Sequence, residues 1–264
     1  MIDNSNIRAA FFDVDGTLLR FDTHTVPVSA ARSLDQLKGN GIFIFIASGR
    51  SANNLQEISD LPYDGVVGLN GTECVLRDGT LVSRHPIPVS AFRRLLEISD
   101  EKNIAVSLET PDGTHFVNRI TPRVIEEAEM VAHPLPIVTN LMDEFLPDVT
   151  TQICLYTDNS TETDILSRIP VLASSRWCNV FADINVSGVD KGSGLIEMMK
   201  FYNLDSRTSI AFGDGGNDIP MLRAAGIGVA MGNASESVRN SADYVTERID
   251  NDGVASALKS FELI

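Results

Sequence analysis

Short apolar runs alternate with amphipathic stretches over the first 70 residues, and the same alternation returns after residue 191. The runs are rich in β-branched and aromatic side chains and are too short for helices, which is typical of parallel strands buried on both faces. Helical spacing between them predicts crossover helices, so the pattern favours an α/β fold with a Rossmann-like, doubly wound parallel sheet. The expected strands are 9–13, 42–47, 65–69 and 209–213, and the expected helices include 29–38, 51–59 and 218–225.

The stretch from residue 84 to residue 185 has a different texture. Helical segments there are mixed with short hairpin-like strands, which indicates an inserted α+β domain. Thr121-Pro122 predicts the start of a helix whose buried face would carry Ile125, Ala128 and Ala132. We therefore expect a core domain made of residues 1–83 and 186–264, interrupted by this insert.

Composition limits the classes of partner. The 264 residues contain 36 acidic and 21 basic side chains, a formal net charge of -15, which argues against a nucleic-acid or anionic-membrane surface. Three scattered cysteines favour a reducing compartment. The polar N-terminus is unlike a signal peptide, and the longest apolar runs are too short to span a bilayer. These features predict a cytoplasmic protein.

Asp13 ends the first expected strand and Asp15 follows two residues later, just before Gly16, so strand alternation would place both side chains on one face. Two carboxylates held this closely favour a bound cation or a shared proton, although an Asp-rich turn alone is often only a solvated loop. A calcium-binding loop counted from Asp13 would need Gly at its sixth position and Glu at its twelfth. Those positions hold Leu18 and His24, so this alternative fails.

A second acidic turn, residues 213–218, follows the strand 209–212. It lacks the third glycine of a dinucleotide fingerprint, and the chain has no Gly-Lys pair for a nucleotide P-loop. Taken alone it would be a loop or a helix cap. Two acidic turns at the carboxyl edge of one sheet instead favour a divalent metal, and oxygen ligands favour magnesium over zinc.

Two further residues are candidates for anion binding. Ser48 ends the strand 42–47, where a hydroxyl is either an N-cap or a donor to an anion. Lys191 is one of only five lysines and opens an expected helix. A cation at a helix N-terminus opposes the macrodipole, which is unfavourable unless an anion lies nearby.

In their order and spacing these elements resemble the haloacid dehalogenase superfamily of phosphohydrolases. The insert is similar to the C2B-type cap of the family's Cof-like branch. In the core, the chain has Ser48-Gly49-Arg50 where many relatives have Thr-Gly-Arg. The residues 21–24 further resemble members that act on sugar phosphates. The stretches that carry the resemblance are 13–17, 48–50, 70–71, 191, 213–218, 225–234 and 242–246.

The resemblance implies a role for each motif. Asp13 would attack phosphorus and form an aspartyl-phosphate. Asp15 would protonate the leaving oxygen and later accept a proton from water. Ser48 and Lys191 would hold the phosphoryl oxygens. Mg²⁺ would be bound by Asp13, Asp214 and the backbone carbonyl of Asp15.

Other residues would support these groups. Asn217 and Asp218 would orient the metal site and Lys191, and Thr17 would steady the loop. The insert would close over the substrate. Near the end of the insert, Arg176 and Trp177 could either touch substrate or pack inside that domain. The residues expected to bind substrate or phosphate are Thr17, Gly49, Arg50, Asn70, Gly71 and Asn217.

The sequence thus predicts a magnesium-dependent phosphatase for small phosphorylated metabolites, with sugar phosphates as the expected substrates. A phosphomutase and a non-catalytic sugar-phosphate sensor are the alternatives. The first shares the aspartyl-phosphate step, and the second would bind without turnover.

Overall fold

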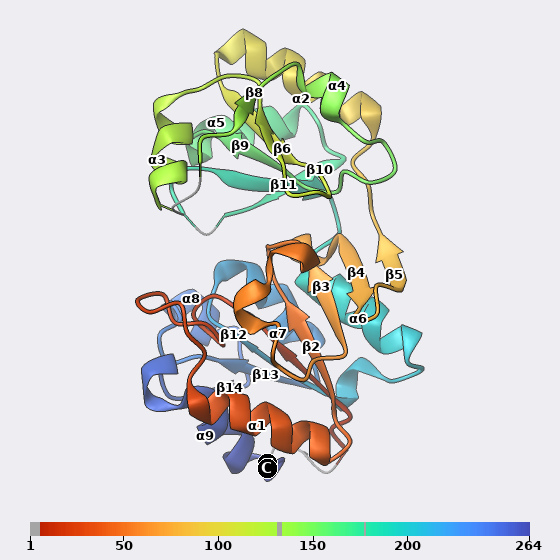
Figure 1. Ribbon diagram of the computed structural model, residues 1–264, viewed down its shortest axis with the longest axis vertical. Coiled ribbons are helices and arrows are strands. Elements are labelled where there is room, and N and C mark those ends of the chain that lie inside the picture. Colours follow the sequence, from red (N-terminus) through yellow and green to blue (C-terminus); the bar gives the residue numbers. More distant parts are fainter. Residues whose placement is uncertain (1–5, 131–133, 177) are drawn as a thin grey trace. The chain divides into compact units, whose positions relative to one another are not determined.

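The computed structural model describes residues 6–130, 134–176 and 178–264. The chain divides into two compact units, one formed by residues 1–83 and 189–264 and the other by residues 84–188. Each unit has its own sheet (Figure 1). Each also has its own hydrophobic core.

The first unit is built on an eight-stranded sheet in the order β14-β13-β12-β1-β2-β3-β4-β5. Strands from β14 to β3 run parallel, and β4 pairs antiparallel with β3. This arrangement confirms the predicted α/β fold. The strands are β1 (Ala9–Phe12), β2 (Phe43–Ala47), β3 (Gly65–Gly68), β4 (Glu73–Leu76), β5 (Leu81–Arg84), β12 (Ser209–Gly213), β13 (Ile227–Ala230) and β14 (Tyr244–Val245).

Helices cover both faces of this sheet because alternate strand residues point to opposite sides. Phe12 lies in the core beneath α1 and α9, two helices from opposite ends of the chain that pack side by side (Figure 1). Phe11 lies in the core beneath α6 and α7. The helices are α1 (Val28–Gly39), α6 (Lys191–Phe201), α7 (Ile219–Ala224), α8 (Glu236–Arg239) and α9 (Gly253–Ser260).

The second unit has a six-stranded sheet in the order β10-β11-β9-β6-β7-β8, antiparallel except where β8 joins β7. Its larger core lies beneath α2 and α5, while α3 covers part of the other face. The elements are α2 (Val89–Lys102), β6 (Ala105–Glu109), β7 (His115–Val117), α3 (Pro122–Met130), β8 (Ile137–Val138), α4 (Leu141–Glu144), β9 (Ile153–Tyr156), α5 (Asn159–Ser167), β10 (Leu172–Ser175) and β11 (Ala182–Val186).

Two local predictions were wrong. Residues 51–59 form two short 3₁₀ turns instead of a helix, because Leu55 between them leaves the helical region with a φ of -124°. In α3 the buried side chains are Val124 and Ala128, whereas Ile125 is 41% exposed. Ala132, the third residue of the expected face, lies outside the described residues.

Candidate active site

Asp13 is the first residue after β1, and its backbone N–H donates to the Phe212 carbonyl of the neighbouring β12. Its side chain is buried, and its Oδ1 accepts a 2.6 Å hydrogen bond from Lys191 Nζ. No hydrogen-bond partner for its Oδ2 lies among the described residues. A buried, unpartnered carboxylate oxygen is costly, so this atom is the natural point of contact for a ligand.

Lys191 begins α6 and is completely buried. Its ammonium group also donates to Asp218 Oδ1 at 2.6 Å, while Asp218 Oδ2 accepts from the backbone N–H groups of Asp214 and Gly215. Asp218 therefore holds the second acidic loop in shape and orients the lysine with the same carboxylate. This geometry fits the supporting role expected for it.

The first acidic loop approaches Asp214 closely. Gly16 has a φ of +91°, and a Cβ on it would lie 2.3 Å from Asp214 Oδ2, so only glycine fits there. The Asn233 amide donates both to the Gly16 carbonyl and to Asp214 Oδ2 and so connects the two loops. Asn233 is not among the predicted site residues, although it lies in the stretch 225–234 that carries the family resemblance.

Three acids around one lysine leave an excess of negative charge. Burial and the neighbouring Asp218 raise the pKa of Asp214 to about 7. Burial and Asp218 also raise the pKa of Asp13 well above its usual range. Burial alone would lower the pKa of Lys191, but Asp13 and Asp218 outweigh it and keep the lysine charged. A bound cation would therefore offset the excess negative charge of this cluster.

The residues present fit a small, hard cation. Asp13, Asp214 and Asp218 each offer a carboxylate oxygen, and these atoms lie within 4.8 Å of one another. Carboxylate oxygens are the ligands that Mg²⁺ prefers. Both oxygens of Asp218 already accept hydrogen bonds, which favours the carboxylates of Asp13 and Asp214 as the direct ligands.

Ser48 and Arg50 lie in the turn after β2, with Gly49 between them. The Ser48 hydroxyl oxygen accepts a hydrogen bond from the Arg50 backbone N–H at 3.1 Å, which uses the oxygen as an acceptor and not the O–H. The Arg50 side chain is turned to Asp15 and to Glu57. Glu57 was not among the expected site residues, and nothing in its sequence surroundings distinguishes it.

The loops near α6, the helix that begins at Lys191, contain Asn70, Gly71 and Asn217. Asn217 Nδ2 donates to Asn70 Oδ1 at 3.0 Å, so the loop after β3 is connected to the second acidic loop. At Gly71, where φ is +94°, an added Cβ would lie 2.0 Å from the carbonyl oxygen of Asp190, the residue before Lys191. Gly71 thus permits the start of α6 to approach.

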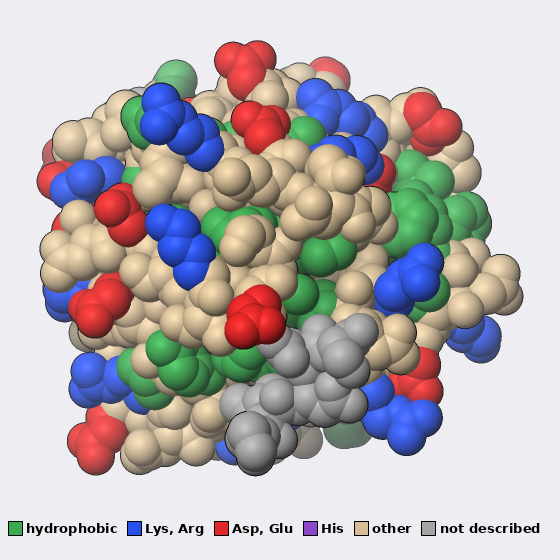
Figure 2. All heavy atoms as spheres, turned by 90° about the horizontal axis from the view of Figure 1, so that it is seen from below, with side chains coloured by type: hydrophobic (Ala, Val, Ile, Leu, Met, Phe, Trp, Pro, Cys, Tyr) green, Lys and Arg blue, Asp and Glu red, His purple; other side chains and the backbone are tan. Residues whose placement is uncertain are grey.

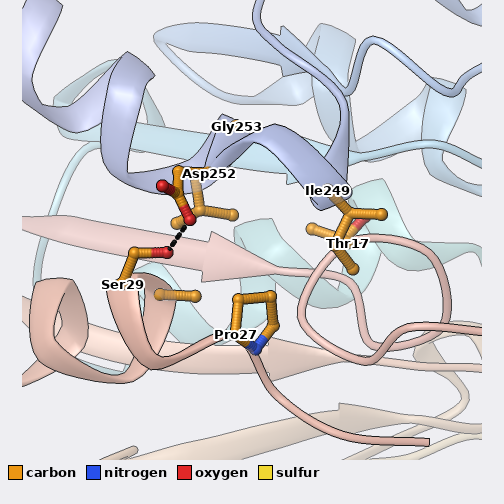
Figure 3. Close-up of a pocket in the computed structure, with 8 residues that line it drawn as sticks. Thr17, Pro27, Ser29, Ile249, Asp252 and Gly253 are labelled. Atoms are coloured by element: carbon orange, nitrogen blue, oxygen red, sulfur yellow. Dashed lines mark hydrogen bonds between the residues drawn. The ribbon is translucent and has the colours of Figure 1, made fainter. Parts of the chain in front are cut away.

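Thr17 follows Gly16 and is fully buried, and it lines a small pocket beside α1 and α9 (Figure 3). No hydrogen-bond partner for its Oγ1 lies among the described residues. In that pocket Ser29 donates to Asp252 at 2.5 Å, and Thr17 lies next to Ile249. The pocket is narrower than a water molecule, so it offers no ligand site of its own. A phosphate contact for Thr17 stays a prediction.

In the second unit, Arg176 donates to the buried Glu162 through Nε and Nη2 and to the Thr157 carbonyl. These bonds favour the packing role over the substrate contact. Trp177 lies outside the described residues.

On the face drawn in Figure 2, Lys and Arg side chains are interspersed with Asp and Glu and form no continuous basic strip among the coloured residues. Within the described part of the chain, no helix has both the length and the apolar character to cross a membrane.

Comparison with known proteins adds to this geometry. The sequence profile of the haloacid dehalogenase-like hydrolases matches residues 10–258. The solved structure of BT1666 from Bacteroides thetaiotaomicron, described as a phosphatase of the haloalkanoate (HAD) enzyme superfamily, is 46% identical, with a TM-score of 0.94 and coverage of 98% of this chain and 96% of that one.

Two other relatives are similar over almost their whole length. The HAD subclass IIB sugar phosphatase BT4131 is 32% identical, with a TM-score of 0.87 and coverage of 97% of this chain and 100% of that chain. A protein of Bacillus subtilis (strain 168) named "Putative phosphatase YkrA" is 31% identical over 255 residues, covering 96% of this chain and 97% of that protein.

Proposed function

Since this chain belongs to the haloacid dehalogenase-like hydrolase family and is a phosphatase of that family, we propose that it hydrolyses sugar phosphates with the help of Mg²⁺. Similarity to a protein described as a sugar phosphatase supports this substrate class. The acidic cluster and its fit to a hard cation support the metal.

Asp13 is the proposed nucleophile. Its Oδ2 would attack phosphorus, a P–O bond to Asp13 would form, and the P–O bond to the sugar would break. The hydrogen bond from Lys191 to Oδ1 would hold the carboxylate while Oδ2 reacts. The single observation that carries the proposal is this buried Oδ2 without a described partner.

Asp15 is the proposed acid and base. It would give a proton to the departing sugar oxygen, and it would later take a proton from the water that cleaves the aspartyl-phosphate. Free phosphate and the alcohol are then the products, and Asp13 is regenerated.

The remaining groups would neutralise charge on the phosphoryl oxygens. The Ser48 O–H would donate to one of them, and the Lys191 ammonium would offset their charge. Asp13 and Asp214, with the Asp15 backbone carbonyl, would hold Mg²⁺, which when bound supplies further neutralisation of phosphoryl charge.

The proposal predicts that Asp13→Asn lowers kcat on hexose and pentose phosphates by on the order of 10³-fold or more, because the amide is not a nucleophile. Phosphate release is measured across a panel of esters, without any bisphosphate activator. Asp78→Asn, the same change at an exposed hairpin acid, serves as the matched control and should keep wild-type rates.

Chelation should abolish turnover, and added Mg²⁺ should restore it. Wild-type rates in Asp13→Asn would exclude the nucleophile, and undiminished rates after chelation would exclude the metal. Turnover of other phosphate esters but of no sugar phosphate would overturn the substrate class alone.

A further inference from the structure

Arg50 is engaged on two sides. Its Nε donates to Asp15 Oδ2 at 3.0 Å and its Nη2 donates to Asp15 Oδ1 at 2.6 Å, a bidentate pair. Its Nη1 donates to Glu57 Oε1 at 3.2 Å. Three of the five guanidinium N–H donors are thus committed to two carboxylates, and each Asp15 oxygen accepts from one defined nitrogen.

The backbone of Arg50 is fixed as well. Its N–H donates to the Ser48 hydroxyl, and its carbonyl accepts from Leu69 N–H at 3.0 Å. The guanidinium therefore extends from an anchored position, and Glu57 holds its far edge. A planar fork held in this way fixes the orientation of the carboxylate that it binds.

Folding stability alone does not account for this arrangement. The side chains of Asp15, Arg50 and Glu57 are 37%, 30% and 38% exposed, and ion pairs with that much solvent contact contribute little to folding. A bidentate pair still adds geometric specificity. A carboxylate has about four lone-pair sites and the guanidinium occupies two of them, so Asp15 can still exchange a proton elsewhere.

We propose that Arg50 is a positioning residue, supported by Glu57, which sets the orientation of the Asp15 carboxylate for proton transfer. This inference rests on the proposed function and assigns Arg50 a role other than the phosphate binding expected from sequence. Glu57 acts one step further out, by holding Arg50 against Asp15.

The kinetic test uses two esters with different leaving groups. An alkyl ester such as a sugar phosphate or glycerol phosphate needs its leaving oxygen protonated, whereas p-nitrophenyl phosphate needs this far less. Arg50→Lys keeps the charge but not the fork, so we expect kcat on the alkyl ester to fall roughly 10- to 100-fold, as for loss of positioned proton transfer. The fall on the aryl ester should be several-fold smaller, with KM on both changed less than about threefold.

Glu57→Gln should lower kcat in the same pattern but less. Combined with Arg50→Lys it should add little, because the two residues act on one carboxylate. The matched control is Arg207→Lys, which removes a similar fork, on Asp205, at an exposed surface turn and should change neither rate.

Other kinetic outcomes overturn the proposal. A raised KM with unchanged kcat means that Arg50 binds phosphate. An equal loss on both esters, or a loss that tracks the unfolding temperature, means that the role is structural.

A measurement without turnover separates this proposal from the proposed function. In NMR spectra the Arg50 Nε–H should be protected from water exchange in the wild type and should lose that protection in Asp15→Asn. If protection is the same in both, the pairing is wrong. If the wild type hydrolyses no ester but the protection behaves as expected, the pairing holds while the proposed function and the positioning role both fail.

Discussion

Lys191 is a fully buried ammonium group whose charge is balanced by the carboxylates of Asp13 and Asp218. A buried charge without partners would be very costly, so each carboxylate stabilises the lysine as well as serving its own loop. Of the two carboxylates, Asp218 should contribute more to stability, because its second oxygen also accepts hydrogen bonds from two backbone N–H groups.

Asp218→Asn should therefore destabilise the protein. An amide cannot present an oxygen to the lysine and another to the two backbone donors, so a buried charge loses a partner. We expect a loss of about 3–5 kcal/mol in the free energy of unfolding, measured in urea. Asp205→Asn, which breaks an exposed pair with Arg207, should cost less than about 1 kcal/mol. Equal losses in the two variants would contradict this account.

At the scale of elements, the sequence predicts those helices, strands and turns whose structure depends on a single segment of the chain. Apolar runs located the central strands, and the acidic turn after β1 follows from its own residues. The contacts of Asn233 with Asp214 and of Glu57 with Arg50 could not be predicted, because they depend on where separate loops meet. The two 3₁₀ turns after β2 differ from the predicted helix for another reason. The residues there have helical spacing, and this spacing does not reveal the break in the backbone at Leu55.

The close approach of two elements explains why residue 71 is a glycine. This residue lies at the end of a 3₁₀ turn after β3, against the carbonyl of Asp190 just before α6. Asp190 directly precedes Lys191, so this contact lies beside the residue whose ammonium group donates to Asp13.

Gly71→Ala should force the two backbones apart. We expect a loss of about 2–4 kcal/mol in stability, above the cost of roughly 1–2 kcal/mol for an L-residue with positive φ. The rate of phosphate release should fall as well, because Lys191 moves. Gly79→Ala is the matched control, since its φ of +86° is similar and no atom lies within 4 Å of the added Cβ. If both variants lose the same stability, the collision with Asp190 is not the cause.

At the scale of the whole molecule, the acidic cluster couples folding to pH. The pKa of Asp214 is raised to about 7 from an ordinary value of 3.8, so the folded protein binds this proton more tightly than the unfolded chain. The protonation of Asp214 therefore stabilises the folded state fully below about pH 4, and this stabilisation is lost as pH rises through 7. Asp13, whose pKa is also raised, acts in the same direction.

Without metal, the free energy of unfolding should therefore fall between pH 4 and pH 7 by on the order of a few kcal/mol from this cluster. Added Mg²⁺ should stabilise the protein more at pH 8 than at pH 5, because protons and the cation compete for the same oxygens. Urea unfolding at several pH values, with Mg²⁺ or with chelator, measures both effects. Asp214→Asn should reduce the slope and the response to Mg²⁺; an unchanged slope would exclude Asp214 as its source.

The first unit is discontinuous in the chain. Asp13 belongs to its first segment, whereas Lys191, Asp214 and Asp218 belong to its second, which follows residues 84–188. Even β12, which pairs with β1 in the middle of the sheet, comes from this later segment. Because domains fold as the chain is synthesised from its N-terminus, a nascent polypeptide carries Asp13, the proposed nucleophile, long before Lys191 and the acidic turn 213–218 exist. We therefore expect incomplete translation products to be inactive, and the hydrolase to become competent only after the segment that begins at residue 189 has joined the sheet.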